Sequence, residues 1–342
     1  MTNKKRLTCL VVILCMALTV VVAGCGGAKS TDSSKPKNWK LGHVRPVGSI
    51  DDIAMKEFAD KVKSETAGTL NIQLFPSSQL GDYKVVQERI GMGDIEMQLA
   101  PVSTSVNKGL GIAAAPYLAT NWAEARRIYA RDGVLIKAVS QMFQKQGIRL
   151  LAVYPKYFGG IALSIEPKSP GDPNVAKGIK IRVPGMKSFE LTGQALGYIS
   201  TPLAFSEAFT AMQTGIVNGV LGSGAEGYYS SFRDLTKFYL PVNSHFEMWF
   251  LYVSESAWKK LSDKEQKVLE AAAVKLESDT FVKAEKLQKE FENKLAAGGT
   301  KVYKFTDAEL AAFAKKVRAE AWPKIKQEYG AELFDSLTKG MN

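Results

Sequence analysis

The chain has 342 residues, of which 46% are hydrophobic and 23% charged, a composition typical of folded globular proteins that excludes a disordered chain. Its formal net charge is +11, but basic and acidic residues are interspersed and no base-reading motif occurs, which argues against nucleic-acid binding. The chain has only two histidines and three cysteines, too few nitrogen and sulfur ligands for a typical zinc or copper site, so we expect neither metal nor cofactor.

The N-terminus has the pattern of an export signal. Lys4, Lys5 and Arg6 precede an apolar run over residues 7–22, and small residues then lead to Cys25. The apolar run is too short for a comfortable membrane span. The pattern resembles a bacterial lipoprotein signal, in which cleavage before Cys25 frees that thiol for lipid attachment. An ordinary signal peptide and a short anchor helix are the alternatives.

This resemblance implies a mature protein in the periplasm or cell envelope, anchored to the membrane through Cys25. We expect a signal peptide over residues 1–24 and a flexible tether over 25–38, where Ser, Lys and Pro occur without apolar periodicity. Cys9 and Cys15 would leave with the signal. The exported domain then has no disulfide and must be held by a large apolar core.

The chain after the tether alternates short strands with helices. Apolar periodicity predicts a helix around Ile53, Phe58 and Val62 that ends at Gly68. Alternation or short apolar runs predict strands at residues 39–44, 70–74 and 95–100, with a further helix at 85–90. Repeated strand–helix units favour open α/β sheets with mostly parallel strands.

A second series begins near Ile161. It contains expected strands at residues 179–183, 216–221 and 246–253, and helices at 189–196 and between Pro202 and Gly215. Ser262 with Glu265 forms a capping box for a helix that reaches about Ala297. Such a helix is unusually long, so we expect it to span two lobes.

The last helix should begin at a second capping box. Thr306 with Glu309 has the required spacing, and Pro323 lies inside the helix that follows, where we expect a kink or break.

No constellation for catalysis is complete. There is no phosphate-binding loop, and residues 91–93 (Gly-Met-Gly) lack the third glycine of a dinucleotide fingerprint. Residues 222–224 (Gly-Ser-Gly) do not complete a nucleophile turn. Asp51 and Asp52 lie at a predicted helix start, where they complement the helix dipole. We therefore predict that the protein is not an enzyme.

The most distinctive region lies between residues 177 and 224. Residues 177–184 read Lys-Gly-Ile-Lys-Ile-Arg-Val-Pro, and residues 205–219 read Phe-Ser-Glu-Ala-Phe-Thr-Ala-Met-Gln-Thr-Gly-Ile-Val-Asn-Gly. Together with residues 75–81, 91–97 and 243–258, this region resembles the solute-binding proteins of tripartite ATP-independent periplasmic (TRAP) transporters, of the dicarboxylate-binding (DctP) type. The resemblance covers nearly the whole mature chain from about residue 39.

The resemblance implies an α/β fold of the two-lobe periplasmic-binding-protein (Venus flytrap) type, with mixed sheets and a long helix spanning both lobes. One lobe would comprise residues 39–158 with 247–285, and the other 159–246 with 286–342. It also implies TRAP permease subunits as partners, a small organic acid as ligand, and Arg182 as the residue that clamps the ligand carboxylate. A guanidinium suits that role because it binds a carboxylate through two parallel hydrogen bonds. We expect a monomer.

The departures from the family pattern bear on the ligand. Residues 218–223 read Asn-Gly-Val-Leu-Gly-Ser, so the asparagine usual in the family is replaced near Gly222. Residues 157–160 (Tyr-Phe-Gly-Gly) stand where a second polar donor is usual. The loss of these donors argues against a C4-dicarboxylate, whose second charge would be unpaired.

Aromatic residues and glycines take the place of those donors. We therefore predict a bulky or aromatic monocarboxylate, with a C4-dicarboxylate receptor or a ligand-binding sensor lipoprotein as alternatives. Besides Arg182, the candidate ligand-binding residues are Asn218, Ser223, Tyr228, Trp249, Phe246, His43, Ser103, Tyr157 and Glu226. A carboxylate at Glu226 or Glu247 would suit an amino group on the ligand.

Overall fold

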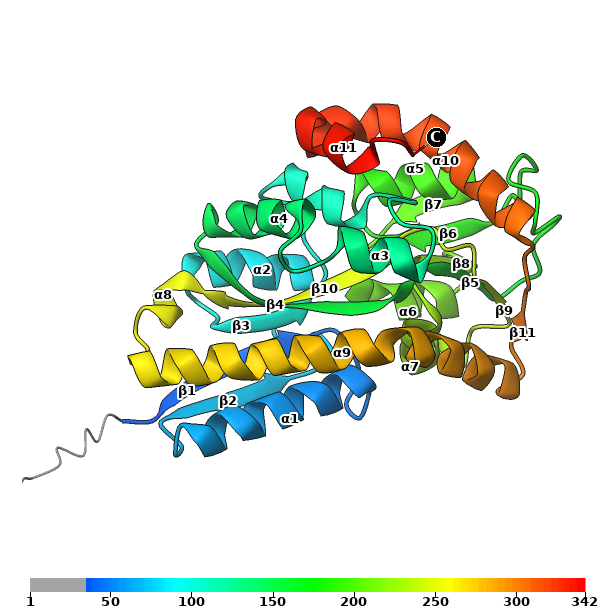
Figure 1. Ribbon diagram of the computed structural model, residues 1–342. Helices are drawn as coiled ribbons and strands as arrows, with labels where there is room; N and C mark the ends of the chain where they lie inside the picture. The colour runs from blue at the N-terminus through cyan, green and yellow to red at the C-terminus, as the bar shows by residue number, and fades with distance from the viewer. Residues whose placement is uncertain (1–34, 342) are drawn as a thin grey trace, which may run out of the picture. The chain divides into compact units, whose positions relative to one another are not determined.

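The computed structural model describes residues 35–341, and those from Pro36 onward form one compact unit built on two β-sheets (Figure 1). The first sheet has the strand order β2-β1-β3-β10-β4. Its strands are β1 (Lys37–His43), β2 (Leu70–Phe75), β3 (Met97–Ala100), β4 (Ile148–Phe158) and β10 (Phe246–Ser254). Strand β1 is parallel to β2 and β3, whereas β10 runs antiparallel to β3 and β4.

The second sheet has the order β11-β9-β5-β8-β6-β7. Its strands are β5 (Gly160–Leu163), β6 (Lys180–Val183), β7 (Ile199–Pro202), β8 (Gly219–Ser223), β9 (Phe238–Leu240) and β11 (Lys301–Val302). Strand β6 pairs in parallel with β7 and β8, and β5 is antiparallel to β8 and β9. Both sheets are therefore mixed, as expected for the fold class.

Helices cover both sheets (Figure 1). Those before β6 are α1 (Ile50–Glu65), α2 (Tyr83–Met92), the 3-10 helix η1 (Lys108–Ala114), α3 (Trp122–Ile128) and α4 (Val134–Gln144). Those after it are α5 (Lys187–Ala195), α6 (Phe205–Gln213), α7 (Ala225–Phe232), α8 (Glu255–Trp258), α9 (Asp263–Ala297), α10 (Asp307–Tyr329) and α11 (Ala331–Thr338).

The long helix α9 contacts elements of both sheets, which confirms the expectation of a helix spanning the two lobes (Figure 1). Its N-terminal half packs Leu269 into the core of the first sheet, and its C-terminal half packs Phe291 into that of the second. Between them, Glu277 and Gln288 accept hydrogen bonds from backbone amides of β4. The helix is thereby fixed along its length to the strand that links the sheets.

Both predicted capping boxes are present. In α9 the Ser262 and Glu265 side chains cap each other's backbone amides, and Thr306 and Glu309 do the same in α10. Of the kink or break expected at Pro323, the break does not occur, because α10 continues through it. Pro323 lies on the exposed side of α10, where water can bond the carbonyl that proline leaves unpaired, while buried residues hold the helix on both sides of it.

Strand β1 includes the last two residues of the expected tether, Lys37 and Asn38. Lys37 pairs with Leu70 in β2, and its Nζ lies 2.9 Å from Glu265 Oε2 at the start of α9. The signal peptide and Cys25 lie outside the described residues. The lobe boundaries remain a prediction.

The two sheets are joined where β4 passes into β5 with only Gly159 between them. The Gly159 amide donates to the His245 carbonyl at 2.8 Å, and the Ser244 amide donates to the Gly159 carbonyl at 2.9 Å. A side chain at position 159 would begin 2.0 Å from the His245 ring, so only glycine permits this approach. The crossing thereby brings the segment before β10 against the ends of β4 and β5.

Candidate functional site

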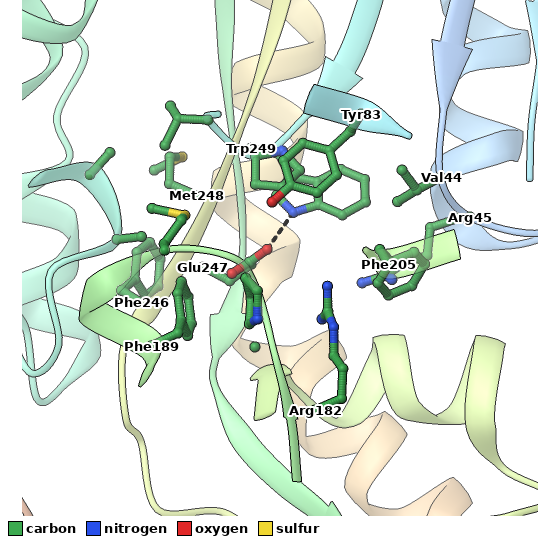
Figure 2. Close-up of a pocket in the computed structure, with 17 residues that line it drawn as sticks. Val44, Arg45, Tyr83, Arg182, Phe189, Phe205, Phe246, Glu247, Met248 and Trp249 are labelled. Carbon is green, nitrogen blue, oxygen red and sulfur yellow. Dashed lines mark hydrogen bonds between the residues drawn. The ribbon is translucent and has the colours of Figure 1, made fainter. Parts of the chain in front are cut away.

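A partly enclosed cavity of about 40 Å³ is lined by residues from both sheets (Figure 2). Most of the lining is apolar or aromatic, and the charged members are Arg45, Arg182 and Glu247. The remaining lining residues are Val44, Tyr83, Pro101, Val102, Ala113, Ala114, Pro184, Met186, Phe189, Phe205, Gly222, Phe246, Met248 and Trp249. A cavity with an apolar wall and a few convergent polar groups is the usual form of a small-molecule site.

Arg182 extends from β6 into this cavity (Figure 2). It is only 2% exposed, and its Nε donates to the Leu203 carbonyl at 3.0 Å. Its guanidinium lies 5.6 Å from the centre of the Phe205 ring. Within residues 35–341, no carboxylate lies within 4 Å of it and no hydrogen bond engages its terminal nitrogens. Burial lowers the pKa of Arg182, because a charged group without a counter-ion is disfavoured inside the protein. An anionic ligand could supply that counter-ion.

Arg45 is a second buried guanidinium at the cavity, and the sequence analysis missed it. It follows β1 and is 1% exposed. Its Nη2 donates to Tyr157 Oη at 2.6 Å and to Ser223 Oγ at 3.2 Å, which joins the first sheet to β8 of the second. Its position just after a parallel strand could have indicated a role at the site, because ligands of α/β proteins bind beyond the carboxyl ends of parallel strands.

Arg45 belongs to a balanced ion cluster that also contains Lys156, Asp51 and Glu226. Lys156 Nζ lies 2.5 Å from Asp51 Oδ1 and 2.9 Å from Glu226 Oε2. Arg45 Nε lies 3.7 Å from both carboxylates. Burial alone would raise the pKa of Asp51, but Lys156 and Arg45 hold it below its usual value. Asp51 therefore does more than complement the dipole of α1.

Glu247 enters the cavity from β10 (Figure 2). Its Oε1 accepts a hydrogen bond from Trp249 Nε1 at 2.6 Å, and its Oε2 lies 2.9 Å from His245 Nε2. The other nitrogen of the His245 ring lies 3.0 Å from Ser244 Oγ. These contacts fix the position of the Glu247 carboxylate at the cavity wall.

The structure brings three of the predicted ligand-binding residues to the cavity lining: Arg182, Phe246 and Trp249. Tyr157 and Ser223 lie behind the lining and bond each other at 2.8 Å as well as Arg45. Glu226 is 2% exposed and lies in the ion cluster. These three residues therefore hold Arg45 and Lys156 instead of lining the cavity.

Four further candidates lie outside the lining. Tyr228 Oη lies 2.9 Å from the Gly160 carbonyl and 2.8 Å from that of Val220, and the backbone of Asn218 bonds Ser164 and Lys180. His43 Nε2 lies 3.2 Å from Asp52 Oδ1, and burial lowers the pKa of this histidine. Ser103 bonds Ser105 and Gln87. These contacts place all four residues outside the cavity lining.

The aromatic wall differs from the expected one. Phe189, Phe205 and Tyr83 join the candidates Phe246 and Trp249 at the cavity. The other aromatic candidates, Tyr157 and Tyr228, lie outside the lining. Aromatic residues predict a wall poorly because they fill cores equally well.

Gly222 shapes the wall beside Pro184. Its φ is +105°, a conformation that favours glycine, and a Cβ there would lie 2.6 Å from Pro184 Cγ. No side chain can enter the cavity from position 222 without movement of Pro184. This is the position near which the resemblance led us to expect an asparagine.

Two searches of the described residues bear on other functions. Residues 35–341 contain no group of three or more His, Cys, Asp or Glu side chains placed to hold a metal ion. In the same part of the chain, no helix combines the length and the apolar character that crossing a membrane requires.

Two mixed sheets share one long helix, and residues of both sheets line one cavity. Among residues 35–341, the buried Arg182 at this cavity has no carboxylate within 4 Å. This arrangement is that of a two-lobed binding protein. Residues 41–328 match the model of the bacterial extracellular solute-binding proteins, family 7 (DctP). The chain belongs to this family, and the resemblance to TRAP solute-binding proteins of the DctP type is confirmed.

Individual relatives agree with this assignment. The sialic acid-binding periplasmic protein SiaP of Vibrio cholerae is 26% identical over 269 residues, which cover 76% of this chain and 79% of SiaP. The TRAP solute-binding protein of Polaromonas sp. bound to D-erythronate is 26% identical with a TM-score of 0.79, and the match covers 89% of this chain and 99% of that one. The TRAP protein of Sulfurospirillum deleyianum with bound succinate has a TM-score of 0.79 at 21% identity, covering 88% and 98% of the two chains. That last likeness shows the fold alone.

Proposed function

We propose that this TRAP receptor captures a monocarboxylate whose acid group binds Arg182. The observation that carries the proposal is the 2% exposed guanidinium with no carboxylate within 4 Å among the described residues. A bidentate carboxylate would supply both the missing charge and the acceptors for the terminal nitrogens. The family supports an organic acid as ligand and permease subunits as partners.

The charge balance of the site favours one ligand carboxylate. Arg45 and Lys156 are already balanced by Asp51 and Glu226, so this cluster offers no surplus positive charge. Arg182 faces a single lining carboxylate, Glu247. A second ligand carboxylate would therefore enter a site without a free cation to pair with it, at a cost of several kcal/mol.

The alternative is a C4-dicarboxylate receptor, and Arg45 is the observation in its favour. The Nη1 of Arg45 has no hydrogen bond within residues 35–341, so this nitrogen could meet a second carboxylate. Of the similar structures described above, one holds D-erythronate, a hydroxylated monocarboxylate, and another holds succinate, a dicarboxylate. Because Asp51 and Glu226 balance the charges of Arg45 and Lys156, we favour the monocarboxylate.

The cavity wall suits a flat or compact apolar body. Rings of Phe189, Phe205, Phe246 and Trp249 surround it, and planar groups stack on such rings. The cavity volume of about 40 Å³ could hold only about three or four water molecules, at roughly 10–15 Å³ each. A bulky ligand would therefore require the two lobes to separate further, the hinge motion common among binding proteins.

A thermal-shift screen of organic acids followed by calorimetry tests this proposal. We expect aromatic and branched monocarboxylates to stabilise the protein more than succinate or malate. Preferential stabilisation by the diacids would instead establish the dicarboxylate alternative. Mass spectrometry of molecules that co-purify with the protein identifies the ligand independently of the screen.

We also propose that the receptor is lipid-anchored through Cys25 at the outer face of the cytoplasmic membrane or elsewhere in the cell envelope. The support is the basic, apolar and small-residue order of residues 4–25. Fractionation of cells that express Cys25→Ser should move the protein from the membrane fraction. Retention of this variant in the membrane to the level of the native chain would overturn the anchor.

A further inference from the structure

Glu247 presents an anion to the same cavity as Arg182 (Figure 2). Among the described residues that line the cavity, Glu247 alone is acidic, and it is 7% exposed. Arg182 comes from β6 of the second sheet and Glu247 from β10 of the first. A ligand between the sheets therefore meets a cation on one side and an anion on the other.

The Glu247 carboxylate has hydrogen-bonding capacity left. Trp249 Nε1 donates to Oε1 at 2.6 Å, and His245 Nε2 lies 2.9 Å from Oε2. An ionised carboxylate offers about four acceptor sites, so each oxygen keeps about one. Within residues 35–341, no lysine or arginine nitrogen lies within 4 Å of Glu247.

A ligand with nothing but a carboxylate fits this arrangement poorly. Its carboxylate on Arg182 would lie near the Glu247 carboxylate, whose remaining acceptor sites would stay unused, and like charges in a site of low dielectric repel. A hydroxyl or ammonium group on the ligand removes this conflict because it donates to Glu247. The ammonium group also supplies a positive charge opposite the carboxylate.

We propose that Glu247 determines specificity by accepting a hydrogen bond from a hydroxyl or ammonium group close to the ligand carboxylate. This inference rests on the proposed function, in which Arg182 holds the carboxylate. It selects 2-hydroxy or 2-amino acids over the corresponding unsubstituted acids. Trp249 and His245 act as positioning residues, since they hold the Glu247 carboxylate toward the cavity.

Calorimetry on the mature protein with two matched series of acids tests the inference. The branched series is 3-methylbutanoate, 2-hydroxy-3-methylbutanoate and valine, and the aromatic series is phenylacetate, mandelate and phenylglycine. Within each series only the group beside the carboxylate changes. In at least one series, we expect the hydroxy or the amino acid to bind at least tenfold more tightly than the unsubstituted acid. Equal affinities, or no binding by any of the six acids at millimolar concentration, would overturn the inference.

The variant Glu247→Gln separates specificity from structural support. It keeps the size of the side chain and one acceptor oxygen but removes the charge. We expect it to weaken binding of the amino acid at least tenfold and of the hydroxy acid less, without weakening binding of the unsubstituted acid. The control Glu255→Gln makes the same exchange at a partly exposed ion pair with Arg149 and should change none of the affinities.

The two proposals fail in different ways. A uniform loss for all three acids in Glu247→Gln means that Glu247 only supports the fold, and the specificity inference is then overturned while the Arg182 clamp stands. Unchanged affinities in an Arg182 variant overturn the clamp itself. The ratio between donor-bearing and unsubstituted acids is the readout that a merely structural role of Glu247 would not alter.

Discussion

Replacement of Arg182 by methionine separates the contribution of its charge to binding from its contribution to stability. Methionine has a similar unbranched length and carries no charge. In the empty protein, Arg182 is buried without a carboxylate within 4 Å in the described part of the chain, and burial lowers its pKa. Since that burial disfavours the charged form, the native arginine should destabilise the empty protein rather than stabilise it.

The expected magnitudes follow from the contacts. A bidentate carboxylate would make two charge-assisted hydrogen bonds with Arg182, each worth about 1.5–3 kcal/mol, so its affinity should fall by at least about 100-fold in Arg182→Met. The same exchange removes the 3.0 Å hydrogen bond to the Leu203 carbonyl, a loss of about 1 kcal/mol. Relief from burying an unpaired charge should offset this loss, so the free energy of unfolding should stay level or rise by about 1–2 kcal/mol.

Calorimetry with the best acid of the screen measures the affinity, and urea unfolding of the empty protein measures the stability. Lys180→Met is the matched control, because Lys180 is an exposed cation on the same strand, β6. It should leave the affinity nearly unchanged. A loss of less than tenfold in Arg182→Met, or an equal loss in Lys180→Met, would show that no specific clamp exists at position 182.

Three further predictions concern the ion cluster beside the cavity. Lys156→Met removes a cation that lies 2.5 Å from Asp51 and 2.9 Å from Glu226. The free energy of unfolding at neutral pH, measured with urea, should therefore fall by about 3–5 kcal/mol. A loss under about 1 kcal/mol would contradict a stabilising role of the ion cluster. Because the folded-state pKa of Asp51 is lowered, the contribution of Asp51 to the free energy of unfolding is complete above its unfolded pKa of about 3.9 and is lost as the pH falls below that value. This loss of stability in acid should be smaller in Lys156→Met. Tyr157→Phe removes the hydroxyl between Arg45 Nη2 and Ser223 Oγ and should lower the free energy of unfolding by about 1–2 kcal/mol. The control Tyr303→Phe, at a more exposed phenol, should lower it less. Equal effects of the two substitutions would exclude a special role for the buried hydroxyl.

Features set by neighbouring residues could be predicted from the sequence. The two capping boxes each depend on residues three positions apart, and both formed as expected. Arg182 was singled out by the resemblance to TRAP receptors, and it lies on the short strand β6, two residues before Pro184. These signals are local, so they do not require knowledge of how the sheets are arranged.

Arg45 and Glu247 could not be placed in this way. The partners of Arg45 are Tyr157 and Ser223, which only the crossing of the chain between sheets brings to it. Glu247 lies on β10, every residue of which is buried, so alternation cannot distinguish one face of the strand from the other. For the same reason the aromatic residues of the cavity and of the cores could not be told apart.

The contact between Gly222 and Pro184 limits how this receptor can change its ligand during evolution. A residue larger than glycine at 222 would be strained by its φ of +105° and would meet the proline ring. An amide at position 222 thus requires a change at Pro184 as well, in the segment that leaves the Arg182 strand. A single substitution at 222 would disturb the existing site before it added a polar group to the cavity wall.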